Sequence, residues 1–173
     1  MAERTPPTGS GRLSFEEFVA QRGSRLLELA WLVTRHPEDA RDAVQDALAG
    51  LYPRWSRLPE GDEFEAYLHR TLVNACLRVI RRRPRTLAVA EPERLRSAPT
   101  ADDPGAAAAA ADDIWRLCGA LPPQQRAAVI LRFHHDLSFA QIAGVLGCRE
   151  ATARSHIHRA LARLRTQLEG DPR

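Results

Sequence analysis

The chain has 173 residues, which is enough for one ordinary domain or for two small helical ones. Its 25 lysine-or-arginine side chains are all arginines, and against 22 acids they give a formal net charge of only +3. An excess this small does not identify a partner, so the local distribution of charge has to be followed along the chain.

Cysteine spacing and hydropathy exclude several classes of protein. Cys76, Cys118 and Cys148 are too widely spaced for a paired zinc site or a small disulfide scaffold, and we expect reduced, mostly buried thiols. The first twelve residues lack the apolar core of a signal peptide, and no later run approaches the ~18 apolar residues of a membrane span. We therefore expect a soluble, cytoplasmic protein with no membrane partner.

Apolar residues recur at helical spacing almost everywhere, which predicts an all-α fold. Two segments lack this periodicity: the N-terminal tail and the proline-bearing stretch from residue 84 to about residue 111. The second segment is typical of a flexible linker, so we expect two small helical domains. Its alanine run, 106–111, is equally compatible with the first turns of the next helix, because alanine is the best helix former.

The first two helices are marked by their N-terminal signals. Ser14 and Glu17 form a capping box, and the apolar stripe that follows predicts a helix to about Thr34, with a break near Gly23 left open. Pro37 suits the first position of a second helix. The exposed face of this second helix is polar, with Arg41, Asp42, Gln45 and Asp46.

The third helix has the opposite charge. It follows a loop, 56–63, and ends before Pro84, because a residue that precedes proline disfavours helical geometry. From Ala66 to Arg85 the chain has six arginines and no acid. Such an imbalance favours a nucleic-acid partner over an ordinary solvated helix end.

The C-terminal block begins with two further amphipathic helices. The first is marked by Ile114, Leu117, Cys118 and Leu121. Pro122 and Pro123 open the second, which carries Val129, Ile130 and Phe133.

A helix-turn-helix follows. Ser138 and Gln141 form a second capping box, and the short helix they start ends at Gly147. The next helix has an apolar stripe that extends to Leu168. Between residues 147 and 165 five arginines face one acid, Glu150, so this helix is attracted to phosphates. Its N-terminal half exposes Thr152, Arg154, Ser155, His158 and Arg159.

No pattern of residues indicates catalysis or metal binding. His156 and His158 point in different directions on a helix, and the adjacent His134 and His135 are equally unsuited to share a metal. There is no phosphate-binding loop, nucleophile triad or carboxylate pair. We expect no enzyme activity, no cofactor and no small-molecule substrate.

Three stretches together resemble the extracytoplasmic-function (ECF) sigma factors of the sigma-70 family, and within them the short actinobacterial SigE-like branch. They are DARDAVQDALAGLYPRW (39–55), EAYLHRTLVNACLRVIRRRP (65–84) and LPPQQRAAVILRFHHDLSFAQIAGVLGCREATARSHIHRALARLR (121–165). The resemblance implies a disordered tail (1–12), sigma region 2 (13–84), a linker (85–111) and sigma region 4 with its helix-turn-helix (112–169).

The resemblance also implies roles for the exposed polar residues. Asp42, Gln45 and Asp46 would bind core RNA polymerase, chiefly its beta-prime subunit, with the beta subunit as a further contact. The minus-10 promoter element would be bound by Asn74, Arg78, Arg81 and Arg82. The minus-35 element would be bound by Arg149, Thr152, Arg154, Ser155, His158 and Arg159. The loop 56–63 would cradle a flipped base. Since Arg78 stands where many relatives carry aspartate, the minus-10 preference cannot be borrowed from them.

These features predict a sigma factor that joins core RNA polymerase and directs transcription initiation at promoter DNA. An anti-sigma protein is a common partner in the family, although no residue here requires one. The alternative is a stand-alone helix-turn-helix regulator that acts without polymerase. It leaves the acidic face and the arginine-rich helix of the N-terminal block unexplained.

Overall fold

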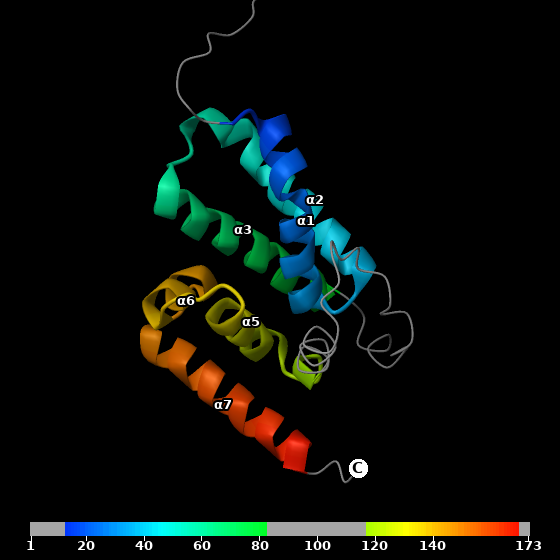
Figure 1. Cartoon of the computed structure of the whole chain (residues 1–173), viewed down its shortest axis with the longest axis vertical. Helices are drawn as coiled ribbons and strands as arrows, with labels where there is room; N and C mark the ends of the chain where they lie inside the picture. Colours follow the sequence, from blue (N-terminus) through cyan, green and yellow to red (C-terminus); the bar gives the residue numbers. More distant parts are fainter. Residues whose placement is uncertain (1–12, 83–116, 170–173) are drawn as a thin grey trace, which may run out of the picture.

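The structure, a computed structural model, describes residues 13–82 and 117–169, in which helices are joined by short turns and loops, with no strand among them (Figure 1). The all-α prediction is confirmed. The predicted tail, the linker and Ile114 lie outside the described residues.

Helix α1 (Phe15–Thr34) begins at the predicted capping box. The Ser14 hydroxyl accepts from the Glu17 backbone N–H at 3.1 Å, and the Glu17 carboxylate accepts from the Ser14 N–H at 2.8 Å. This hydrogen bonding lowers the pKa of Glu17. The helix runs without interruption through Gly23, so the break left open there does not occur. One interior glycine costs only about 1 kcal/mol relative to alanine, which the buried stripe of α1 outweighs.

Two further helices complete the N-terminal block. Helix α2 (Pro37–Leu51) starts at the predicted proline, and a 3-10 helix, η1 (Tyr52–Arg57), follows it directly. Helix α3 (Gly61–Arg82) begins earlier than its apolar stripe suggested. The expected loop 56–63 is therefore reduced to residues 58–60, because η1 and the first turn of α3 take up its two ends.

The C-terminal block contains α5 (Pro123–Phe133), α6 (Phe139–Leu146) and α7 (Glu150–Glu169). Helix α6 has the predicted capping box, with Ser138 and Gln141 exchanging hydrogen bonds of 2.8 and 3.2 Å. Gly147 ends α6 at φ 64° and ψ 38°, a left-handed conformation that glycine adopts without steric cost. The tight turn of the helix-turn-helix follows from this residue.

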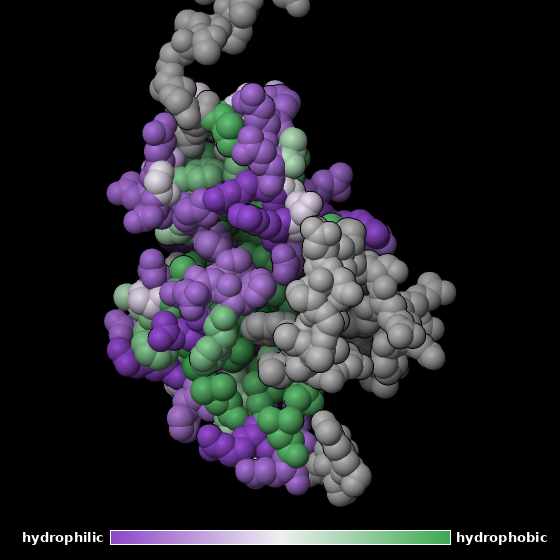
Figure 2. Space-filling view, in the orientation of Figure 1, coloured by the Kyte–Doolittle hydropathy of each residue, from purple (hydrophilic) through white to green (hydrophobic). Residues whose placement is uncertain are grey.

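Several apolar side chains that the helical pattern assigned to the core are exposed. Leu161 is 40% exposed, Leu168 is 63% exposed, and Phe133 at the end of α5 is 55% exposed. Helix α7 has 20 residues and α5 has 11, so Leu168, in the last turn of α7, lies beyond the helix on which it would pack. Figure 2 shows hydrophobic surface over the C-terminal half of α7.

The two blocks pack directly on each other, which the linker prediction did not anticipate. Helix α3 lies against α5 and α6, and α1 lies against α5, so one cluster of buried residues includes side chains from both blocks (Figure 1). The face of α3 that carries His69 meets the C-terminal block. Val73 and Leu77 follow on this face at helical spacing and are buried.

Histidines from the two blocks meet at this interface. His69 Nε2 lies 3.3 Å from His135 Nδ1, and the two rings are 4.8 Å apart in an edge-to-face arrangement. His134 Nε2 lies 3.5 Å from a carboxylate oxygen of Glu28. Burial is the main reason that the pKa of His69 is lowered and that the pKa of His135 falls to about 4. Both rings are therefore neutral at pH 7 while the blocks are packed.

Candidate polymerase and promoter interfaces

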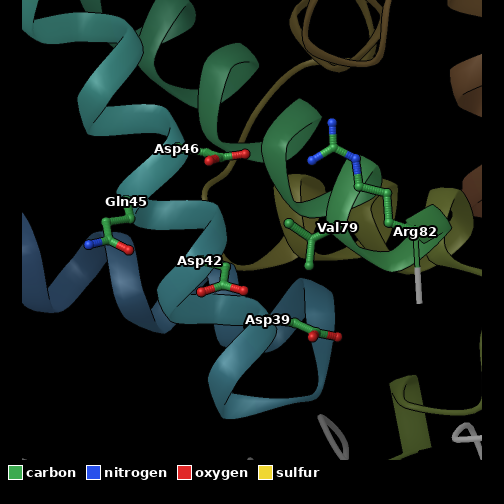
Figure 3. Close-up of a pocket in the computed structure, with 6 residues that line it drawn as sticks. All are labelled: Asp39, Asp42, Gln45, Asp46, Val79 and Arg82. Carbon is green, nitrogen blue, oxygen red and sulfur yellow. The ribbon is translucent and has the colours of Figure 1, made fainter. Parts of the chain in front are cut away.

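The predicted polymerase-binding residues form one surface on α2. Asp42, Gln45 and Asp46 are all exposed, and the buried residues of α2 occupy its opposite side. Together with Asp39, Val79 and Arg82 they line a shallow groove between α2 and α3 (Figure 3). The groove has three carboxylates on its α2 wall and an arginine on its α3 wall.

An ion pair joins this acidic surface to the arginine-rich helix. Arg78 Nη1 lies 3.4 Å from Asp46 Oδ2, and both side chains are nearly half exposed. The sequence separated these residues into two surfaces with different partners, whereas the fold makes them neighbours. An exposed pair of this kind contributes at most about 1 kcal/mol, so either partner is readily released to another ligand.

The predicted minus-10 residues share one side of α3. Arg78, Arg81 and Arg82 are exposed, and Asn74 is half buried. They follow Asn74 by four, seven and eight positions, which places all four on one helix face. Arg81 and Arg82, in the last turn, also interact favourably with the helix dipole and so stabilise the end of α3.

The segment before α3 is built on aromatic side chains. Trp55 packs against Phe18 and Phe64, with ring centroids 4.8 and 5.6 Å away, and its indole N–H donates to the Leu13 carbonyl at 3.1 Å. Leu58, in the shortened loop, is buried. The acids that surround the loop, Glu60, Asp62 and Glu63, are exposed.

The predicted minus-35 residues lie on and just before the first half of α7. Arg149, Thr152, Arg154, His158 and Arg159 are exposed, and Ser155 is half buried. Ala153, Ile157 and Ala160 are buried on the other side of the helix, as the pattern predicted. Burial, and then the nearby Arg159, lower the pKa of His156.

Arg154 has two contacts that sequence reasoning missed. Its Nη2 and Nε lie 2.6 and 3.2 Å from one carboxylate oxygen of Glu150. Its guanidinium carbon lies 4.3 Å from the centre of the Phe139 ring, which belongs to α6. The four-residue spacing from Glu150 was a readable signal, but the stacking on Phe139 depends on how α6 and α7 pack.

Cys76 and Cys118 are buried free thiols and Cys148 is half buried, as expected. Burial raises the pKa of Cys76 to about 12, so that residue remains a thiol. Within residues 13–82 and 117–169, no three His, Cys, Asp or Glu side chains gather where they could hold a metal ion. None of the helices described is long and apolar enough to cross a membrane.

A basic helix-turn-helix, a second arginine-rich helix and an acidic helix face define a DNA-binding transcription protein that also has a protein-binding surface. The family models for sigma-70 region 2 and for sigma-70 region 4 match residues 18–86 and 111–164. The chain therefore belongs to the sigma-70 family.

Individual relatives agree with the family match. The chain is 37% identical over 158 residues to the RNA polymerase sigma-E factor of Streptomyces coelicolor, covering 90% of this chain and 86% of the relative. It is 35% identical over 158 residues to the ECF RNA polymerase sigma factor SigM of Mycobacterium tuberculosis, covering 88% of this chain and 76% of the relative. The chain is thus an ECF-type sigma factor that binds core RNA polymerase and acts in promoter-directed transcription initiation.

The fold agrees with a solved sigma factor. The sigma factor RpoE of Bartonella quintana, in complex with the anti-sigma factor NepR, superposes with a TM-score of 0.67. The match covers 91% of this chain and 98% of that chain at 23% identity, which supports the shared fold.

Proposed function

We propose that the two blocks divide the work of initiation. The N-terminal block, residues 13–84, binds core polymerase and the minus-10 element, and the C-terminal block, 112–169, binds the minus-35 element. The distribution of charge carries this assignment, since exposed aspartates gather on α2 and exposed arginines gather on α3 and α7. Negative side chains repel DNA and suit a protein partner, whereas clustered arginines suit phosphates.

The docking surface on α2 consists of Asp42, Gln45 and Asp46. Its residues are exposed on one side of a helix whose other side is buried, so a partner can reach them without a change of fold. The partner assigned here is the beta-prime subunit of RNA polymerase, with beta as a further contact.

The two DNA surfaces use arginine in different ways. On α3, Arg81 and Arg82 provide charge near the helix end, Arg78 lies about one turn earlier, and Asn74 lies about two turns earlier. On α7, the N-terminal half presents its polar side chains in the manner of a recognition helix that enters the major groove.

We also propose where this chain acts and which kind of protein regulates it. The chain acts in the cytoplasm as a non-enzymatic subunit, since the polymerase supplies the catalytic site. The Bartonella relative is recorded in complex with an anti-sigma factor, and a related regulator is proposed for this chain.

Transcription from purified components tests the proposal. Core RNA polymerase from Streptomyces coelicolor, incubated with this chain, is expected to select particular duplexes from a randomised promoter library and to produce run-off transcripts from them. Core polymerase alone serves as the control and is expected to give no such products. DNA binding by the chain without any transcript that depends on it would instead favour the stand-alone regulator.

Salt dependence tests the assignment of Arg149 to the DNA backbone. We expect R149Q to reduce the magnitude of the slope of log K against log salt by about one for every duplex tested, because one phosphate contact is lost. Fluorescence anisotropy of the holoenzyme on selected duplexes measures the slope. R165Q is the matched control, since Arg165 is exposed and lies about 24 Å further along the helix. Sequence-selective weakening by R149Q would mean that the side chain reads a base.

A further inference from the structure

The arginines of α7 are not equivalent. Within the described part of α7, Arg154 is the arginine that has both a carboxylate partner and an aromatic ring beneath its guanidinium. Exposed arginine side chains are flexible and lose rotational freedom when they bind. Two fixed contacts remove much of this freedom before the ligand arrives.

The ring under Arg154 is a rigid platform. Phe139 is the first residue of α6, whose start is fixed by the capping box of Ser138 and Gln141. It is half buried and packs against the hydrophobic core. Arg132 lies 5.2 Å from the same ring and donates to the Leu137 carbonyl at 2.9 Å. Because Phe139 belongs to the preceding helix, it links the packing of the helix-turn-helix to the orientation of the guanidinium.

Glu150 occupies one edge of the guanidinium and leaves another available. It accepts from Nε and from one hydrogen of Nη2. A guanidinium has five N–H donors, so both hydrogens of Nη1 and the second hydrogen of Nη2 remain for a ligand. This terminal Nη1–Nη2 edge has the geometry to donate to two acceptors together, and guanine O6 and N7 are such a pair in the major groove.

We propose that Phe139 and Glu150 are positioning residues that hold Arg154 for end-on, two-point recognition of a guanine in the minus-35 element. The inference rests on the proposed role of α7. It also explains why an acid stands at the start of a helix that binds DNA. Glu150 repels phosphates, yet it fixes the plane of the arginine that discriminates between bases.

Selection by the holoenzyme tests this inference. Core polymerase with the full-length chain selects from duplexes randomised over both promoter elements, and the wild type is expected to enrich a guanine at one minus-35 position. R154A should reduce the enrichment of guanine at that position by about tenfold or more. E150Q and F139L should each weaken it by about threefold at the same position and leave the other positions unchanged. F139Y retains the ring and should retain the preference.

A further measurement separates positioning from general stability. E150Q removes a negative charge near phosphates, so we expect it to bind all duplexes slightly more tightly while discriminating less between bases. E169Q, at the far end of α7, is the matched control and should change neither property. Thermal unfolding should show F139L folded at the assay temperature.

Three outcomes distinguish the possible failures. Unchanged guanine preference in E150Q and F139L, with loss in R154A, would overturn the positioning role. Unchanged base preferences in R154A, with transcription still directed by the chain, would overturn the inference but not the proposed function. Failure of the wild-type holoenzyme to select or transcribe any duplex would overturn the proposed function itself.

Discussion

Reversing two charges on α2, with D42K and D46K together, is expected to weaken binding to core RNA polymerase by at least about 100-fold, because like charges opposed at an interface cost several kcal/mol. Asp42 and Asp46 are exposed on the same face and line the groove in Figure 3. Neither side chain belongs to the buried core. The loss is therefore expected in binding and not in folding.

The measurement is a titration of labelled chain with core polymerase, and E38K is the matched control. Glu38 is also an exposed acid in α2, where it pairs with Arg41, and it does not line the groove. Asp46 also pairs with Arg78, so the single variant D46K leaves an arginine without its carboxylate. D42K alone avoids this complication and should still weaken binding. If E38K and D42K weaken polymerase binding equally, binding depends on the total charge of α2 and not on the face that carries Asp42 and Asp46.

Local signals in the sequence predicted the helices because each signal acts within a few residues. The capping boxes at Ser14 and Ser138 and the glycine after α6 satisfy backbone groups of their own helix, and the proline at the start of α2 stands where no intrahelical N–H donor is needed. The same short range explains why the sequence left a break at Gly23 open, since the tertiary packing that keeps α1 continuous there is not a local signal.

Contacts between distant segments could not be predicted in the same way. The stacking of Arg154 on Phe139 and the pairing of Asp46 with Arg78 depend on the angles between helices, which no periodicity encodes. The packing of the two blocks has the same origin. The sequence does contain a partial signal for this packing. Val73 and Leu77, which are buried, place apolar side chains on a second face of α3, beyond the face that meets α1 and α2.

This second face has a consequence for promoter binding. The minus-10 and minus-35 elements are about 25 base pairs apart, which is about 85 Å of duplex at about 3.4 Å per base pair. Helix α3 is about 33 Å long and lies directly against α6 of the helix-turn-helix. Under the proposed assignment of one promoter element to each block, the two blocks must separate before they bind both elements together, and the interface between them opposes this step.

Lowering the pH from 8 to 5.5 is expected to favour separation of the blocks, by at most about tenfold through His135, since its pKa is about 4 in the packed form and separation can return it no further than the ordinary value of 6.5. The separated form binds the proton more readily, so packing is fully stable above pH 6.5 and weakens as the pH falls toward 4. His69, whose pKa is also lowered, adds to the effect.

Other charged groups lie around His69 and His135, and the variants that test the histidines must retain these groups. Arg22, which is bonded to Glu65, and Arg25 line the same small cavity as the two histidines, and both arginines oppose a further positive charge there. Asp136 favours it, and Glu28 lies against the neighbouring His134. The variant H69Q/H135Q removes the two titrating rings and retains all these groups. H158Q is the matched control, because His158 is exposed on α7.

Single-molecule FRET between dyes at the exposed positions 41 and 167 counts packed and separated molecules at each pH. The wild type and H158Q should shift toward separated molecules as the pH falls, and H69Q/H135Q should show little change. An equal shift in all three variants would assign the response to other groups, and a flat wild-type profile would mean that the histidine contact does not limit opening. Because the proposed assignment requires the blocks to separate before both promoter elements are bound, acidification should also strengthen binding of the wild-type chain to a polymerase that recognises the separated form.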